Sequence, residues 1–125
     1  MQSVNLSKPP IISVVDDDES VRQATKSLLK ALGLRAEAFS SAEEFLDSLY
    51  LWETDCLILD VRMPGMGGLE LQRQLAAASV QIPIIFTTAH GDQDVRAQAL
   101  AAGAVAFLNK PFSEEALLNA IEIAL

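Results

Sequence analysis

The sequence predicts a three-layer α/β domain in which helices cover both faces of a parallel five-stranded sheet. Strand-like and helix-like segments alternate five times along the 125 residues. The strand-like segments are apolar almost throughout, and strands of that kind need cover on both faces, as parallel sheets have. The length suits one domain, and half of the residues are hydrophobic, which is enough to form a core without disulfides.

Five short segments have the composition of buried strands. They span residues 11–15, 34–39, 56–61, 82–88 and 104–108. Arg35 and Glu37 place charges in the second segment, which suggests that it lies at an edge of the sheet. The third begins with Cys56, the only cysteine, in an apolar run where a small buried core residue is expected rather than a reactive thiol.

A segment with apolar residues at helical spacing follows each strand. Gly33 suits the end of the first helix, and the third helix is expected to span residues 69–78. Residues that can cap helix N-termini precede three others, namely Ser40 and Ser41, Asp92 or Asp94, and Ser113. The residues expected to pack inward are Val21, Thr25, Leu28, Leu29 and Leu32; Ala42, Phe45, Leu46 and Leu49; Leu71 and Leu75; Val95, Ala99 and Ala102; and Leu117, Ala120, Ile121 and Ala124.

Five strand–helix units of this kind usually adopt the flavodoxin-like arrangement, a (βα)5 domain with strand order 2-1-3-4-5. Residues 1–10 are mostly polar, contain two prolines and are expected to form a flexible leader. The predicted domain therefore spans residues 11–125.

Charge and hydropathy exclude several classes of function. The formal net charge is −8, and no run of Lys and Arg supplies the basic patch that nucleic-acid binding needs. The first ten residues lack the apolar core of a signal peptide, and the longest apolar stretch, residues 99–108, is too short to span a bilayer. We therefore expect a cytoplasmic protein that does not enter a membrane and does not bind nucleic acid directly through this segment.

Polar side chains stand at the carboxyl ends of four predicted strands. Asp16 and Asp17 follow the first strand, Asp60 lies near the end of the third, Thr88 ends the fourth, and Lys110 follows the fifth. In a parallel sheet these ends share one edge. The first and third strands would flank the point where the strand order reverses, which is where open α/β sheets bind ligands.

The charges at this edge do not balance. Each pair of carboxylates about 4 Å apart costs roughly 4 kcal/mol at an effective dielectric near 20. Lys110 is one positive charge against three carboxylates, so a divalent cation is needed, and a set of oxygen ligands indicates a hard ion such as Mg²⁺. Asp17 and Asp60 are the expected direct ligands, with Asp16 acting through water.

A carboxylate beside Mg²⁺ and lysine can accept a phosphoryl group and form an acyl phosphate. Asp60 is the expected acceptor, Lys110 would neutralise phosphoryl oxygens, and the Thr88 hydroxyl could donate to another. Each residue also has an ordinary explanation, such as a turn residue for Asp60 or a surface lysine for Lys110. The convergence of four strand ends favours the chemical interpretation. His90, the only histidine, is expected to be an exposed loop residue.

Four segments resemble the signature of response-regulator receiver domains, the CheY-like phosphoacceptor domains of bacterial two-component signalling systems. They are VVDDD at 14–18, LDVRMPGM at 59–66, FTTA at 86–89 and NKPF at 109–112. The resemblance implies that a sensor histidine kinase or phosphotransfer protein phosphorylates Asp60. The domain would then be a signalling phosphoacceptor that assists its own phosphorylation and dephosphorylation rather than an enzyme.

The resemblance also implies roles for individual residues. Mg²⁺ would be bound by Asp17, Asp60 and the backbone carbonyl of Arg62, with Asp16 assisting. Thr88 and Lys110 would contact the phosphoryl group, and the peptide bond from Lys110 to Pro111 would be cis. Phe107 would be the aromatic switch residue that turns inward as Thr88 moves toward the phosphoryl group.

The resemblance further implies an output. The face built from the fourth helix, fifth strand and fifth helix would carry the signal, and phosphorylation could produce a homodimer. Residues 88–92 are similar to receivers whose full proteins carry a helix-turn-helix output domain, through which alone DNA would be bound. Arg62 and His90 stand at positions that vary in the family, and we expect both to restrict or orient the water that hydrolyses the phosphoryl group.

Three other functions fit the sequence less well. A Mg²⁺-dependent phosphatase of the haloacid-dehalogenase type would need an Asp two residues after its nucleophile, where this chain has Arg62. A receiver-like module that signals without phosphorylation usually lacks one of the acidic residues or the lysine, and all are present here. A flavodoxin would need a phosphate-binding loop after the first strand, where this chain has an acidic cluster.

Overall fold

The computed structural model describes residues 9–125, so all but two residues of the expected leader lie outside the described part. Five parallel strands form one sheet in the order β2-β1-β3-β4-β5, as the sequence predicts. They are β1 Ile11–Val15, β2 Arg35–Phe39, β3 Cys56–Asp60, β4 Ile84–Thr88 and β5 Ala106–Asn109. The prediction that β2 is an edge strand is confirmed.

The helices are α1 Glu19–Ala31, α2 Ala42–Leu46, α3 Gly68–Ala77, α4 Gln93–Ala101 and α5 Glu114–Ala124. Capping explains where four of them begin, because a short polar side chain accepts a hydrogen bond from an otherwise unpaired N–H of the first turn. The capping residues are Asp18, Ser41, Asp92 and Ser113.

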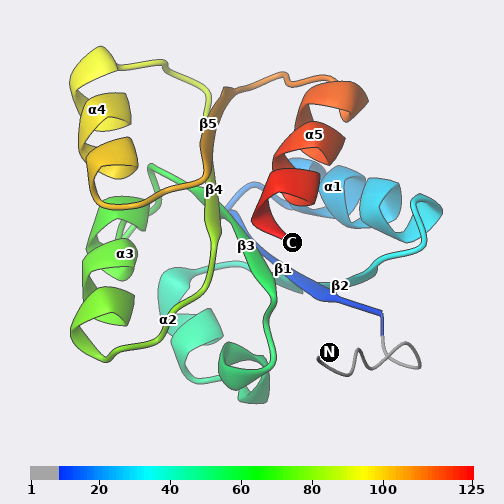
Figure 1. The fold of residues 1–125 in the computed structure, drawn as a ribbon, viewed down its shortest axis with the longest axis horizontal. Helices are drawn as coiled ribbons and strands as arrows, with labels where there is room; N and C mark the ends of the chain where they lie inside the picture. Colours follow the sequence, from blue (N-terminus) through cyan, green and yellow to red (C-terminus); the bar gives the residue numbers. More distant parts are fainter. Residues whose placement is uncertain (1–8) are drawn as a thin grey trace, which may run out of the picture.

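Helices cover both faces of the sheet (Figure 1): α1 and α5 lie on one face, and α2, α3 and α4 lie on the other. Alternate residues of the central strands serve the two faces, since successive side chains of a strand point in opposite directions. Leu57 and Leu59 of β3 join the cluster under α2, α3 and α4, whereas Ile58 joins the cluster under α1 and α5. The sheet is therefore buried on both sides, and its polar groups collect at its edges.

The predicted inward position of Leu49 is wrong. Helix α2 ends at Leu46, and Leu49 is 85% exposed at the start of the 3-10 helix η1, Leu49–Trp52. The cause is local, because the Ser48 side chain accepts a hydrogen bond from the Tyr50 N–H and begins a new turn. Ala102 is likewise exposed, since it lies past the end of α4.

β4 and β5 each begin two residues later than predicted, and β2 begins one residue later. β4 begins at Ile84 because Pro83 has no N–H to donate to a neighbouring strand, although its carbonyl accepts from Leu57 at 2.9 Å. β5 begins at Ala106, after Val105 N–H has donated to the Ile84 carbonyl at 2.8 Å.

Cys56 is fully buried, and burial, followed by the charge of Asp55, raises the pKa of its thiol to about 12. The prediction of a core cysteine is confirmed.

Gly68 allows α3 to begin directly against the end of β3. Its N–H donates to the Val61 carbonyl at 2.9 Å. A Cβ on Gly68 would overlap the carbonyl oxygen of Asp60 and lie 3.0 Å from a ring carbon of Phe86. Both neighbours are fixed, one as backbone and the other as a buried side chain, so only glycine fits here.

We expect Gly68→Ala to lower the free energy of unfolding by about 1–3 kcal/mol because the added methyl group must displace Asp60 backbone or Phe86. Urea unfolding followed by circular dichroism measures this change. Gln74→Ala, on the exposed side of the same helix, is the control and should change stability by less than about 0.5 kcal/mol. Equal stability of Gly68→Ala and wild type would contradict the steric argument.

Candidate functional site

The fold brings the predicted acidic residues together at the carboxyl edge of the sheet. Asp16 and Asp17 follow β1, Asp60 ends the adjacent β3, and one carboxylate oxygen from each lies within 4.8 Å of the other two. Asp16 is 2% exposed and Asp60 is 6% exposed, whereas Asp17 is exposed to solvent. The cluster therefore has two buried carboxylates and one at the surface.

Lys110 reaches this cluster from the end of β5. Its Nζ donates to Asp16 Oδ2 at 2.7 Å and lies 3.5 Å from Asp60 Oδ1. Its backbone N–H donates to the Thr88 carbonyl at 2.7 Å, and the bond to Pro111 is cis, in agreement with the resemblance. Burial alone would lower the pKa of Lys110, but the hydrogen bond and charge of Asp16, with the charge of Asp60, raise it. Lys110 is therefore held in its charged form.

Asp60 shows that the site is short of positive charge. Burial, and then the charge of Asp16, raise its pKa from 3.8 to about 6; Lys110 opposes this, and Asp17 adds to it. A ligand set made only of oxygen atoms, with two carboxylates in excess of the lysine, fits a small divalent cation such as Mg²⁺. The residues present therefore suit the metal that the charge argument predicts.

Thr88 lies at the same edge, but its hydroxyl is occupied. It donates to the His90 carbonyl at 3.1 Å and accepts from the His90 N–H at 3.2 Å, and the residue is 1% exposed. A hydrogen bond from Thr88 to a phosphoryl group would require this pair to open. His90 itself is exposed, as expected for a loop histidine.

Arg62 and Phe107 are also placed. Arg62 is exposed in the loop after β3, where the Val61 N–H still donates to the Thr87 carbonyl at 3.0 Å. Phe107 is 7% exposed, and its ring centroid lies 6.3 Å from that of Phe86. Phe107, the expected switch residue, is therefore already turned inward in this structure.

Two side chains that sequence reasoning missed hold the loops of the site. Arg22 Nη1 donates to the backbone carbonyl of Asp16 at 2.8 Å, and Glu43 Oε2 accepts from the Met66 N–H at 3.2 Å. Arg22 stands in the first turn of α1, and Glu43 stands in the first turn of α2. Their positions suggest ordinary surface residues, and only the packing of the helices shows which loop each one reaches.

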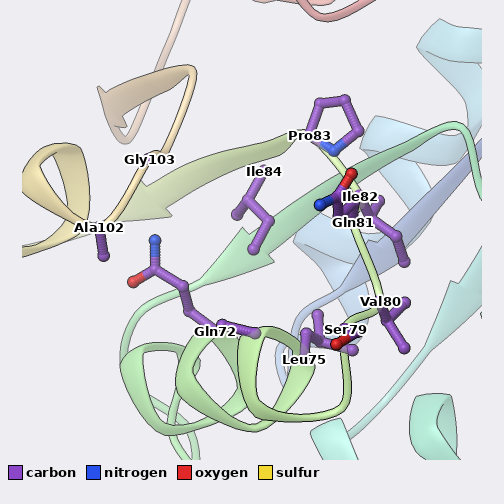
Figure 2. A pocket seen from close by; sticks show the side chains of 11 residues that line it. Gln72, Leu75, Ser79, Val80, Gln81, Ile82, Pro83, Ile84, Ala102 and Gly103 are labelled. Atoms are coloured by element: carbon purple, nitrogen blue, oxygen red, sulfur yellow. The ribbon is translucent and has the colours of Figure 1, made fainter.

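The cleft drawn in Figure 2 lies at the opposite, amino edge of the sheet. It has a volume of about 560 Å³ and is lined by Leu75, Val80, Ile82 and Ile84, with Gln72 at its side. Gln72 Nε2 donates to the Ala99 carbonyl at 3.1 Å, which links α3 to α4. None of the predicted site residues lines this cleft, so we place the functional site at the carboxyl edge.

Within residues 9–125, every helix is too short or too polar to cross a membrane.

Known proteins are similar to this chain over most of its length. The family model of the response regulator receiver domain matches residues 12–122. Response regulator protein TmoT of Ectopseudomonas mendocina is 51% identical over 115 residues, covering 92% of this chain and 52% of that protein. Nodulation protein W of Bradyrhizobium diazoefficiens is 46% identical over 118 residues, covering 94% of this chain and 52% of that protein. The chain thus spans about half the length of these curated relatives.

Solved structures with the same fold include response regulator StyR, with a TM-score of 0.87 and 51% identity over 94% of this chain and 59% of that chain. FixJ-N gives a TM-score of 0.84 and 37% identity over 94% of both chains. Chemotaxis protein CheY4 of Vibrio cholerae gives 0.85 and 29% identity over 94% of this chain and 99% of that one. The family match covers most of the chain and includes the strands that carry the acidic cluster and Lys110, so the chain belongs to the response regulator receiver domain family.

Proposed function

We propose that this domain accepts a phosphoryl group on Asp60 from a sensor histidine kinase or phosphotransfer protein, in a reaction that needs Mg²⁺. The observation that carries the proposal is the set of charged groups around the Asp60 carboxylate. Asp60 is a buried carboxylate that lies beside two others and 3.5 Å from the ammonium group of Lys110, so one positive charge faces three carboxylates. Such a site favours a ligand that brings a divalent cation and a phosphoryl group together.

The donor set assigns separate roles. Asp17, Asp60 and the backbone carbonyl of Arg62 would bind the cation directly. Asp16 already accepts from Lys110 and from the Asp18 N–H at 2.9 Å, which favours an assisting role through water. When bound, Mg²⁺ supplies positive charge that neutralises phosphoryl oxygens.

The chain's own residues then perform the transfer. An oxygen of ionised Asp60 forms the new bond to phosphorus while the bond between phosphorus and the donor's histidine nitrogen breaks. Lys110, already 3.5 Å from Asp60, is placed to neutralise one phosphoryl oxygen. The Thr88 hydroxyl would leave His90 and donate to another.

The movement of Thr88 gives the domain two states. In the state described here, Thr88 is bonded to His90 and Phe107 is buried. Because Phe107 is already inward, we propose that phosphorylation holds it there and does not need to bury it first. The change would be read on the face formed by α4, β5 and α5, as a shift of population between two arrangements.

The donor protein needs access to this edge. A groove of about 500 Å³ runs between α1 and residues 110–112, with Val21, Leu28 and Phe112 along its apolar side and Lys110 at its end. We propose that the kinase or phosphotransfer protein docks against this groove.

The output of the domain would lie elsewhere in a longer protein. Relatives of which this chain spans about half include proteins named as transcriptional regulatory proteins, among them FixJ of Bradyrhizobium diazoefficiens. We propose that a helix-turn-helix domain in the longer protein binds DNA, since this acidic receiver domain does not. We also propose that phosphorylation promotes a homodimer through the face formed by α4, β5 and α5.

Incubation with acetyl phosphate and Mg²⁺ should add one phosphoryl group to the wild-type chain, as measured by intact mass. Asp60→Asn should gain none, because it removes the attacking oxygen, and chelation of Mg²⁺ should abolish the gain in wild type. Asp94→Asn, at an exposed carboxylate on α4, is the control and should be phosphorylated normally. A phosphoryl group on the Asp60→Asn variant, or none on wild type that binds Mg²⁺, would contradict the proposal.

The raised pKa of Asp60 predicts a dependence of stability on pH. Without metal, the folded state holds the Asp60 proton up to a pKa of about 6, against the ordinary 3.8, so the free energy of unfolding falls as pH rises between these values. Asp60→Asn cannot ionise, and we expect it to be more stable than wild type by about 1–3 kcal/mol near pH 7.5, with the difference shrinking toward pH 4.

Urea unfolding in EDTA at several pH values measures this difference. Mg²⁺ should then stabilise wild type more than Asp60→Asn, because binding to the folded state alone raises stability. A difference between the two proteins that does not change with pH would show that Asp60 ionisation does not limit stability.

Arg62 and His90 lie exposed on the two loops that border the site. If their side chains restrict the water that attacks the acyl phosphate, Arg62→Ala and His90→Ala should each lose the phosphoryl group several-fold faster than wild type. Release of inorganic phosphate from the purified phosphoprotein gives the rate, with Arg73→Ala on the exposed side of α3 as control. Unchanged rates in both variants would refute the role assigned to them.

A further inference from the structure

Arg22 is a cation that the proposed mechanism does not use, although it contacts the backbone of the acidic cluster. It is half-buried in the first turn of α1, and its Nη1 donates to the backbone carbonyl of Asp16 at 2.8 Å. An arginine on a helix surface needs no such partner, since water can satisfy its donors. The contact therefore fastens α1 to the segment that joins it to β1.

This segment is short and carries the predicted metal ligands. At its start, the Asp16 N–H donates to the Phe39 carbonyl at 3.1 Å, which continues the pairing with β2. At its end, the Asp18 N–H donates to Asp16 Oδ1 at 2.9 Å, and the Asp18 side chain caps α1. Asp17 lies between these anchors with an exposed carboxylate, so the backbone on each side determines where that carboxylate points.

The carbonyl of Asp16 belongs to the peptide group that it shares with Asp17. That group is planar, so a bond that fixes the carbonyl oxygen also fixes the Asp17 nitrogen and limits rotation of the whole plane. Arg22 holds this plane from the helix side and the Asp18 N–H is anchored on the other side, so together they restrict the direction of the Cα–Cβ bond of Asp17.

We infer that Arg22 is a positioning residue for the divalent-cation site, acting through the Asp16 carbonyl to aim the carboxylate of Asp17. The inference rests on the proposed Mg²⁺ site. Arg22 is not itself a ligand. It would increase the affinity for Mg²⁺ by positioning a ligand, although its positive charge repels the metal. Partners that orient metal ligands in this indirect way commonly affect metal affinity strongly.

Charge and geometry predict opposite results when Arg22 is removed. Loss of a positive charge beside the cluster would by itself tighten Mg²⁺ binding, since like charges repel. Loss of the anchor would let Asp17 take other orientations and weaken binding. The sign of the change therefore decides between the two effects, and a purely structural role for Arg22 would alter stability without altering affinity.

The experiment compares Arg22→Met with Lys26→Met. Both remove one positive charge from α1, and Lys26 stands one helical turn further along it. Titration calorimetry with Mg²⁺, well below the midpoint of thermal unfolding, should show that Arg22→Met binds about 10-fold more weakly than wild type. Lys26→Met should bind as tightly as wild type or slightly more tightly. Binding by Arg22→Met that equals or exceeds that of wild type would overturn the inference.

A second measurement needs no metal. In the metal-free protein, hydrogen exchange of the Asp18 amide, followed by NMR, should become several-fold faster in Arg22→Met, because its bond to Asp16 Oδ1 depends on the same turn. Unchanged exchange would also overturn the inference. If Arg22→Met does not fold, Arg22→Gln, which stays polar but is too short to reach the carbonyl, takes its place. Folded wild type that binds no Mg²⁺ would instead refute the proposed metal site, which separates that failure from the failure of Arg22.

Discussion

The excess of negative charge at the carboxyl edge of the sheet is the constraint on which the site depends. One oxygen from each of three carboxylates lies within 4.8 Å of the other two, and the single ammonium group of Lys110 balances only one of the three charges. The lysine lies closer to Asp16 than to Asp60, and the raised pKa of Asp60 shows that its charge remains undercompensated. A divalent cation would relieve this imbalance, and the positive charge that it brings would in turn attract the oxygens of a phosphoryl group.

Such an edge is costly to fold, and the rest of the molecule offsets that cost. Two apolar clusters cover the sheet, one under α2, α3 and α4 and the other under α1 and α5. Burial of these clusters supplies the main stabilisation, so two buried carboxylates are tolerated where function needs them. Gly68 adds a local constraint, because it lets α3 start against Asp60, the residue proposed as the phosphoryl acceptor.

The loops around the site are held from outside it. Arg22 fastens the loop after β1, Glu43 fastens the loop after β3, and the hydrogen bonds between Thr88 and His90 fasten the loop after β4. The first two contacts leave the side chains of the proposed metal ligands free. The third occupies the Thr88 hydroxyl, so in the proposed mechanism this loop is the one that would rearrange. The division suits a domain with a rigid metal site and one movable reporter.

The sequence alone determined the parallel α/β fold, the strand order, the edge position of β2, the helix caps and the convergence of the acidic residues with Lys110. These follow from apolar periodicity and from residues that act on their own neighbours in the chain. The end of α2 and the bonds between Thr88 and His90 arise from short-range hydrogen bonds that the apolar pattern does not predict. Tertiary structure decided that Phe107 is buried and which loop Arg22 and Glu43 each reach. Long polar side chains have many rotamers of similar energy, and only the packing of distant elements selects one of them.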